Sequence, residues 1–71
     1  MTKAQCLREI RKVKGWENAG LIVSQRKAFW EIKAYCEVLY YWDKYVAVFH
    51  SNKPNCYRAL VAAVRALGDE P

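Results

Sequence analysis

The alternation of apolar and polar side chains that begins at Trp30 constrains the fold of this chain most strongly. Every second residue from Trp30 to Val38 is apolar, and charged residues occupy most of the positions between them. A period of two residues is typical of a β-strand with one buried face. Because an aromatic-rich run continues to Trp42, the pattern predicts a strand over residues 30–42.

The same segment also has a helical spacing, which leaves a second interpretation open. Apolar residues recur at helical intervals at Phe29, Ile32, Cys36, Leu39 and Tyr40. Glu, Lys and Ala, which are frequent here, favour helices. A strand over 30–42 would exceed the usual length of ~5–6 residues. The strand interpretation therefore requires a bulge or bend near residues 35–37.

Helices are predicted at both ends of the chain. Thr2 and Gln5 have the spacing of a capping box, and apolar residues at helical spacing follow until Gly15 supplies a stop. The last helix starts within residues 51–55, which combine cap-forming side chains with a proline suited to a first turn. We expect Gly68 to be the first residue beyond this helix.

Two further strands complete the predicted architecture. Residues 21–23 form a short apolar run, and residues 45–49 predict the last strand after a turn at Asp43-Lys44. The result is one α+β domain over 1–71: a helix, a three-stranded antiparallel sheet and a helix, with both helices on one sheet face. The tail from 68 to 71 is expected to fray.

The cysteines and the hydropathy limit the class of protein. Cys6, Cys36 and Cys56 are widely spaced and form no C-x-x-C pair, which argues against a disulfide framework or a zinc site. We expect buried reduced thiols, no metal and no cofactor. Because no stretch approaches the ~20 apolar residues of a membrane span or resembles a secretory signal, we expect a cytoplasmic protein without a membrane partner.

The charge of the chain predicts an acidic partner. Lys and Arg total 12 against 7 for Asp and Glu, a net charge of +5, which favours nucleic acid, an acidic protein surface or anionic lipid. The candidate nucleic-acid-binding residues are Arg8, Arg11, Lys12, Arg26, Lys27, Lys53 and Arg58. Free N–H groups at the start of the last helix, with Lys53 and Arg58, would suit a phosphate. The alternative is scattered solubilising charge.

A second set of residues is expected on the exposed sheet face. These candidates for stacking or for an interface are Phe29, Lys33, Tyr35, Leu39 and Tyr41. Aromatic rings among cations can stack on single-stranded bases, and they can equally form the centre of a protein interface. A homodimer that buries these residues is a further alternative, because so short a chain has a small core.

Catalysis is not expected. The chain has one histidine, few glycines and no carboxylates at suggestive spacing. A nucleophilic pair of His50 and Cys56 can be considered. A lone histidine is more often structural, so we predict a protein that is not an enzyme.

Three short segments resemble a known family. They are an amphipathic first helix that runs into Gly15-Trp16, a strand that opens with Phe29-Trp30, and the start of the last helix at residues 54–60. In this order they resemble the HicA-type mRNA interferase toxins and the double-stranded-RNA-binding fold that these share. The family's catalytic histidine would fall near Phe29, which cannot transfer protons. The resemblance therefore implies an RNA-binding scaffold without catalysis.

Two functions from different classes follow. The first is a small, basic, non-catalytic protein that binds nucleic acid and prefers RNA. The second is a protein-interaction module of the kind that phages and mobile elements encode to inhibit a host complex, such as an anti-CRISPR or an inhibitor of a regulator. The small size and an aromatic fraction of 14% motivate it, with Tyr35, Leu39 and Tyr41 as hot spots.

Overall fold

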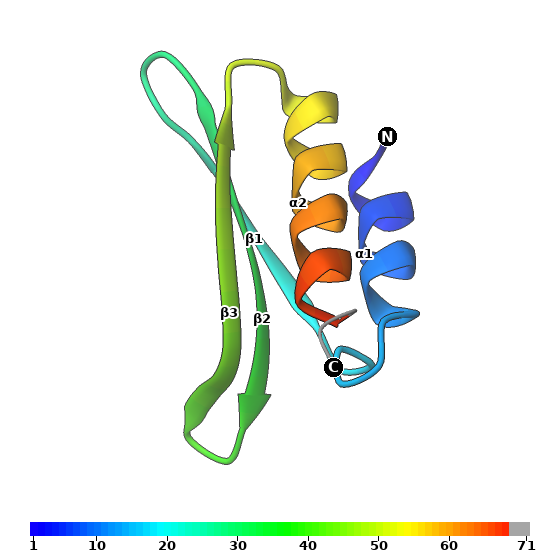
Figure 1. Cartoon of the computed structure of the whole chain (residues 1–71). Helices are drawn as coiled ribbons and strands as arrows, with labels where there is room; N and C mark the ends of the chain where they lie inside the picture. The colour runs from blue at the N-terminus through cyan, green and yellow to red at the C-terminus, as the bar shows by residue number, and fades with distance from the viewer. Residues whose placement is uncertain (69–71) are drawn as a thin grey trace.

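The computed structural model describes residues 1–68 and has the predicted order of helix, three strands and helix (Figure 1). The elements are α1 (Lys3–Arg11), β1 (Gly20–Gln25), β2 (Trp30–Val38), β3 (Tyr41–His50) and α2 (Lys53–Gly68). The α+β class is confirmed, and the strand interpretation of the segment after Trp30 is correct. Of the tail predicted to fray, residues 69–71 lie outside the described residues, whereas Gly68 belongs to α2.

The strands form an antiparallel sheet in the order β1-β2-β3. On β2, Ile32, Ala34 and Cys36 are buried on the side of the helices, as the alternation predicts. The predicted irregularity is also present, since the register between β2 and β3 shifts between Cys36 and Glu37. An extra residue in one strand bends the ribbon and lets a long hairpin twist.

The turn between β2 and β3 lies at Leu39 and Tyr40, so the predicted turn at Asp43-Lys44 is wrong. Leu39 has a φ of 57°. This left-handed region is costly for residues other than glycine, and a leucine therefore gives no turn signal in the sequence. Asp43 and Lys44 lie within β3 instead, at the shift in register.

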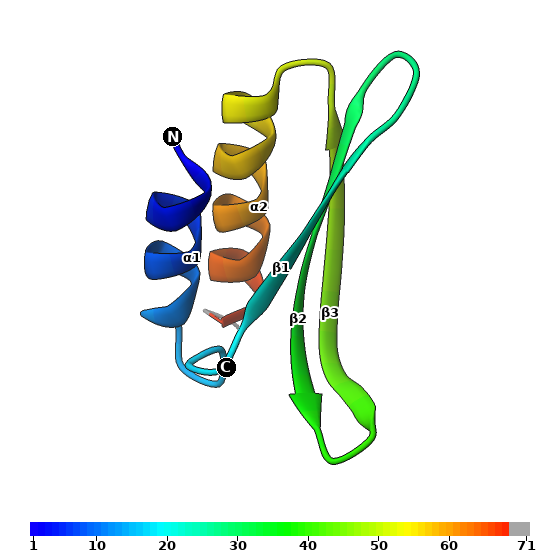
Figure 2. The same cartoon turned by 180° about the vertical axis from the view of Figure 1, so that it is seen from behind.

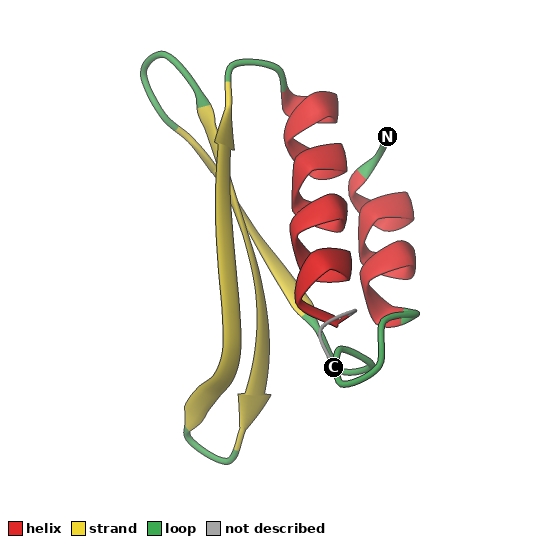
Figure 3. Cartoon of the chain, viewed as in Figure 1, coloured by secondary structure: helices red, strands yellow, loops and turns green. Residues whose placement is uncertain are grey.

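Both helices lie on one side of the sheet (Figures 1 and 2). α2 packs against β2 and β3, and α1 packs against α2. The fully buried side chains of Ile10, Leu60 and Val64 join the helices to the sheet in one core. Neither helix within residues 1–68 has the length and apolar character needed to cross a membrane. Among the described residues, the other sheet face carries no helix, as predicted (Figure 3).

Polar side chains cap both helices. The Thr2 hydroxyl accepts from the Gln5 N–H at 3.2 Å, and the Gln5 side chain accepts from the Thr2 N–H at 2.9 Å, which confirms the capping box. At α2, the Asn52 side chain accepts from the Asn55 N–H at 3.0 Å. Each cap satisfies a backbone N–H that has no partner within the helix.

The helix ends differ slightly from those predicted. α1 ends at Arg11, before the expected stop at Gly15. Gly15 lies in the following turn with a φ of 91°, a conformation that glycine adopts without strain. α2 includes Gly68 rather than ending before it. The glycines thus mark the ends of the helical regions to within a turn.

We predict that Leu60→Ala lowers the free energy of unfolding by about 2–5 kcal/mol, because it leaves a cavity between α2 and the sheet. Leu60 is fully buried, whereas Leu67 on the same helix is about half exposed. Leu67→Ala is the matched control and should cost less than about 1 kcal/mol. Urea denaturation followed by circular dichroism measures both, and equal losses would contradict the packing described here.

Candidate nucleic-acid interface

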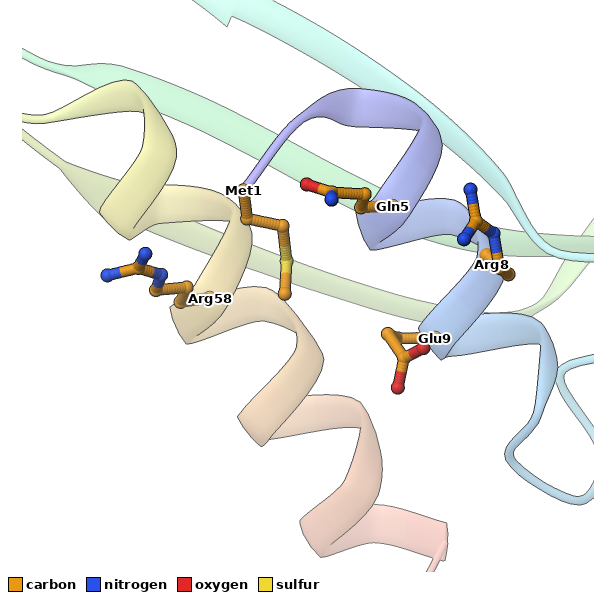
Figure 4. A pocket seen from close by; sticks show the side chains of 5 residues that line it. All are labelled: Met1, Gln5, Arg8, Glu9 and Arg58. Atoms are coloured by element: carbon orange, nitrogen blue, oxygen red, sulfur yellow. The ribbon is translucent and has the colours of Figure 1, made fainter.

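A shallow hollow between the two helices has an arginine on each side (Figure 4). The residues that line it are Met1, Gln5, Arg8, Glu9 and Arg58. Arg8 extends from α1, and Arg58 extends from α2 near its start. Because α1 packs against α2, two residues that are far apart in the sequence border one surface depression.

The one carboxylate that lines this hollow, Glu9, pairs with cations other than the two arginines. The carboxylate of Glu9 is held by Lys12 at 2.8 Å and by Arg65 at 2.7 Å. The hydrogen bond from Lys12 is the main cause that lowers the pKa of Glu9. Among residues 1–68, neither Arg8 nor Arg58 forms an ion pair. Within the described part of the chain, both guanidinium groups of the hollow are therefore outside any ion pair.

The other two basic residues predicted on α1 lie next to Arg8 but are engaged. A second shallow hollow on this helix is lined by Ala4, Leu7, Arg8, Arg11 and Lys12. Arg11 Nε donates to the carbonyl oxygen of Ala19 at 3.1 Å, and Lys12 pairs with Glu9. Arg8 thus borders both hollows. Among the described residues it forms neither an ion pair nor a hydrogen bond of the kind that engages Arg11 and Lys12.

The loop between β1 and β2 forms a second basic region. A polar hollow there is lined by Gln25, Arg26, Lys27, Ala28, Phe29, Trp30 and Ser51. Arg26 pairs at 2.6 Å with Glu31, which is only 8% exposed. A buried carboxylate without a partner is costly, so Arg26 stabilises the fold. Lys27 has no ion pair among the described residues and is the free cation of this loop.

Lys53, the first residue of α2, contacts Trp30 at the end of this loop. Its Nζ lies 4.8 Å from the centre of the Trp30 ring, within the range of a cation–π interaction. Trp30 also lines the loop hollow. In Figure 1 the loop and the start of α2 lie at the same end of the molecule as the N-terminus. Two of the three predicted basic regions therefore lie at one end of the fold, whereas Arg8 and Arg11 lie in the last turn of α1, further from this end.

The expected phosphate cradle at the start of α2 is mostly absent. Pro54 has no N–H, and the N–H of Asn55 is bonded to the Asn52 side chain. Of the first three helical residues, only Lys53 keeps an N–H that is not taken up in this way. The start of α2 therefore offers fewer free N–H groups than the sequence predicted.

His50 and Cys56 do not form a nucleophilic pair. The Cys56 thiol donates to the carbonyl oxygens of Val48 at 3.6 Å and Trp30 at 3.7 Å, and burial raises its pKa. His50 Nδ1 accepts from the Asn52 N–H at 2.9 Å. The thiol remains protonated, and the imidazole helps to shape the loop before α2. Within residues 1–68, no group of His, Cys, Asp and Glu side chains has the arrangement of a metal site.

The three thiols give the protein a stability that depends on pH. Burial, and then the charge of Cys56, raise the pKa of Cys6 from 9.0 to about 11. The unfolded chain therefore loses this proton at a lower pH than the folded protein does. The stabilisation is complete below pH 9 and is lost as the pH rises towards 11. Burial raises the pKa of Tyr57 in the same direction.

We predict that the free energy of unfolding falls as the pH rises from 9 to 11, because the unfolded thiol ionises first. Guanidinium denaturation at fixed pH values measures this decrease. Cys6→Ala is the control: its decrease should be smaller, since the remaining titration comes from other groups. An identical slope in both proteins would show that Cys6 does not titrate as described.

The exposed sheet face carries a stack of three aromatic rings. Tyr35 on β2 stacks on Trp42 of β3 with ring centres 4.8 Å apart, and Trp42 stacks on Tyr45 at 5.5 Å. The strand partner of Tyr35 on β1 is Gly20. The Tyr35 ring lies so close to Gly20 that a Cβ there would come within 2.7 Å of the ring. The glycine thus positions the first ring of the stack.

The sequence predicted only part of this face. Lys33 and Tyr35 lie on it, as expected, and Phe29 lies in the neighbouring turn, edge-to-face with Phe49 at 5.7 Å. The placement of two residues is wrong: Leu39 lies in the hairpin turn, and Tyr41 pairs with Val38 on the opposite face. Trp42, Tyr45 and Phe49 were missed. Strict alternation from Trp42 would not have found Tyr45 and Phe49 even with the turn at Leu39, because the shift in register adds Asp43 to β3.

Comparison with protein-family models, with curated proteins and with solved structures finds no match to this chain. The function is therefore argued from the fold and from the geometry of its surfaces. Two surfaces stand out, the hollow between the helices that Arg8 and Arg58 border and the aromatic hairpin of β2 and β3. The β1–β2 loop and the start of α2 lie at the end of the molecule opposite the β2–β3 turn (Figure 1).

Proposed function

We propose that this protein binds RNA through a basic surface formed by α1, the β1–β2 loop and the start of α2. Among residues 1–68, the members of this basic surface that form no ion pair are Arg8, Lys27, Lys53 and Arg58. The pair of arginines across one hollow carries the proposal, because guanidinium groups bind phosphate oxygens through two parallel hydrogen bonds. The carboxylate that lines this hollow, Glu9, forms ion pairs with Lys12 and Arg65.

The element order supports RNA rather than DNA as the ligand. The chain has the order α-β-β-β-α, which the resemblance to double-stranded-RNA-binding folds implies. Such domains recognise the shape of the duplex through contacts with phosphates and 2′-hydroxyl groups. The proposed activity is binding without catalysis, since the Cys56 thiol and His50 are each engaged with backbone groups.

We predict that the protein binds an RNA duplex with an affinity that falls steeply with salt, because binding releases counterions from the phosphates. Arg8→Ala combined with Arg58→Ala should weaken binding about tenfold or more and reduce the salt slope by about 2. Fluorescence anisotropy with labelled duplex RNA, single-stranded RNA and duplex DNA measures both quantities and the preference among ligands. Lys27 is the residue to test in the loop, because loss of Arg26 would also leave Glu31 unpaired.

The matched control removes two cations elsewhere. Lys14 and Lys44 line a hollow with Trp16 and Leu67. Lys44 pairs with Asp43 at 3.0 Å, but both side chains are exposed, so the loss of this pair costs little. Lys14→Ala combined with Lys44→Ala lowers the net charge equally, so it should weaken binding by less than about threefold if contacts rather than total charge decide the affinity. No binding at low salt, or equal losses in both double variants, would refute the proposal.

The tip of the β2–β3 hairpin favours a second function, the binding of a protein partner. Leu39 is 80% exposed in its left-handed conformation, and Tyr40 is fully exposed. Strained and exposed apolar residues cluster at binding sites, where function maintains them against their cost. The hairpin also extends beyond the helices, which makes its tip accessible (Figures 1 and 2).

We predict that Leu39→Gly stabilises the fold by up to about 1 kcal/mol, because glycine adopts the positive φ without strain. Tyr40→Gly, in the same turn without a positive φ, should instead destabilise it by about 0.5–1 kcal/mol. Thermal denaturation measures both changes. If the tip binds a protein, Leu39→Gly also loses a partner that the wild type retains from a nuclease-treated lysate. Retention of that partner by this well-folded variant would refute the second function.

A further inference from the structure

The outer edge of β3 lacks the usual protection of an edge strand. β3 ends the sheet, and its residues 45–50 contain no Lys, Arg, Asp, Glu or Pro. Natural proteins place charges or prolines on such edges, because unpaired N–H and C=O groups accept another strand. In β3 the charged residues are Asp43 and Lys44, near the hairpin turn. The remainder of the edge can pair with a further strand.

The side chains of this edge are also unusually exposed. Tyr45 and Phe49, both on the open sheet face, are 48% and 58% exposed. The opposite edge differs, because β1 (Gly20–Gln25) has no exposed large hydrophobic residue. A strand added to β3 would cover two aromatic rings, whereas a strand added to β1 would cover none. This difference favours β3 as the edge that is used.

The flank of α2 above this edge allows a close approach. Arg65 contacts Glu9 on α1 and so marks the flank of α2 that faces α1. The periodicity of the helix places Ala59, Ala63 and Ala66 on the opposite flank. With strands ~4.8 Å apart, two copies of α2 on a continuous sheet would lie about 10 Å apart. Small side chains suit the usual helix packing distance of about 8–10 Å.

We infer that β3 pairs with β3 of a second copy of this chain, antiparallel and across a two-fold axis at Ala47. Residues that face each other in an antiparallel pair lie on the same face of the sheet. With the axis at Ala47, Tyr45 of one copy faces Phe49 of the other on the open face. On the side of the helices, Val46 of one copy faces Val48 of the other. The two sheets become one sheet of six strands.

A second copy fits this edge better than an unrelated strand does. An antiparallel pair of identical strands is self-complementary, which is the symmetry of most dimers. Because β3 runs from the hairpin turn to the end of the molecule that carries the β1–β2 loop and the start of α2 (Figure 1), the antiparallel arrangement keeps the two positively charged basic surfaces apart. It also brings Asp43 opposite Ser51 of the second copy, close to Lys53 at the start of its α2. The dimer does not depend on RNA binding.

The dimer is tested by a substitution that favours the folded monomer and opposes the pairing. Ala47 faces Lys33 across β2 and β3, so the carboxylate of Ala47→Glu can pair with Lys33 within one chain. Across the two-fold axis the two introduced carboxylates would face each other, and like charges in that position are destabilising. We predict by sedimentation velocity that wild type dimerises and that Ala47→Glu raises the dissociation constant about tenfold or more.

Ile22→Glu is the matched control, because Ile22 faces the same Lys33 from β1. It should leave the dimerisation constant unchanged. Circular dichroism checks that both variants are folded. A wild type that stays monomeric at several hundred micromolar would overturn the inference. A dimer that Ile22→Glu dissociates and Ala47→Glu does not would overturn it as well, since the β1 edge would then be the interface.

A covalent test does not depend on the strength of the dimer. The native cysteines are buried, so an introduced thiol on the sheet is the one available to an oxidant. The Ala47→Cys thiols of two copies would meet at the axis within the Cα distance that a disulfide allows. We expect a disulfide-linked dimer on a non-reducing gel and none with Ile22→Cys. Equal crosslinking of the two variants would contradict the axis at Ala47.

Discussion

Burial of one face of α2 against β2 and β3 determines where every surface of this protein lies. Leu60 and Val64 are fully buried in this contact, and α1 in turn packs against α2. The contact leaves one sheet face uncovered and sets Arg58 across a hollow from Arg8. The packing of α2 on the sheet therefore determines the positions of both the basic surface and the aromatic stack.

The fold also sorts the cations into those that stabilise it and those that are free. Arg26 compensates the buried Glu31, while Lys12 and Arg65 share the carboxylate of Glu9. In the part of the chain that the structure describes, Arg8, Lys27, Lys53 and Arg58 form no ion pair. The proposed RNA binding depends on the unpaired cations rather than on the net charge of +5. A guanidinium that already pairs with a carboxylate has fewer N–H donors available for a phosphate.

The sequence predicted the fold well where local chemistry determines it. The alternation on β2, the capping box at Thr2 and the irregularity near Cys36 all follow from neighbouring residues. The hairpin turn could not be predicted, because Leu39 takes a conformation that favours glycine. That error misplaced Leu39 and Tyr41, and Trp42 shares the face of Tyr45 only through the shift in register. The ion pairs that divide the cations depend on tertiary contacts, so no pattern in the sequence indicates them.

Backbone amide NMR signals followed during titration with an RNA duplex show which surface binds RNA. We predict that the largest shift changes fall on α1, on the β1–β2 loop and on the start of α2, around Arg8, Lys27 and Arg58. Changes confined to the β2–β3 hairpin, or spread evenly over the surface, would contradict it. In the first case the aromatic hairpin rather than the basic surface would be the site that binds RNA.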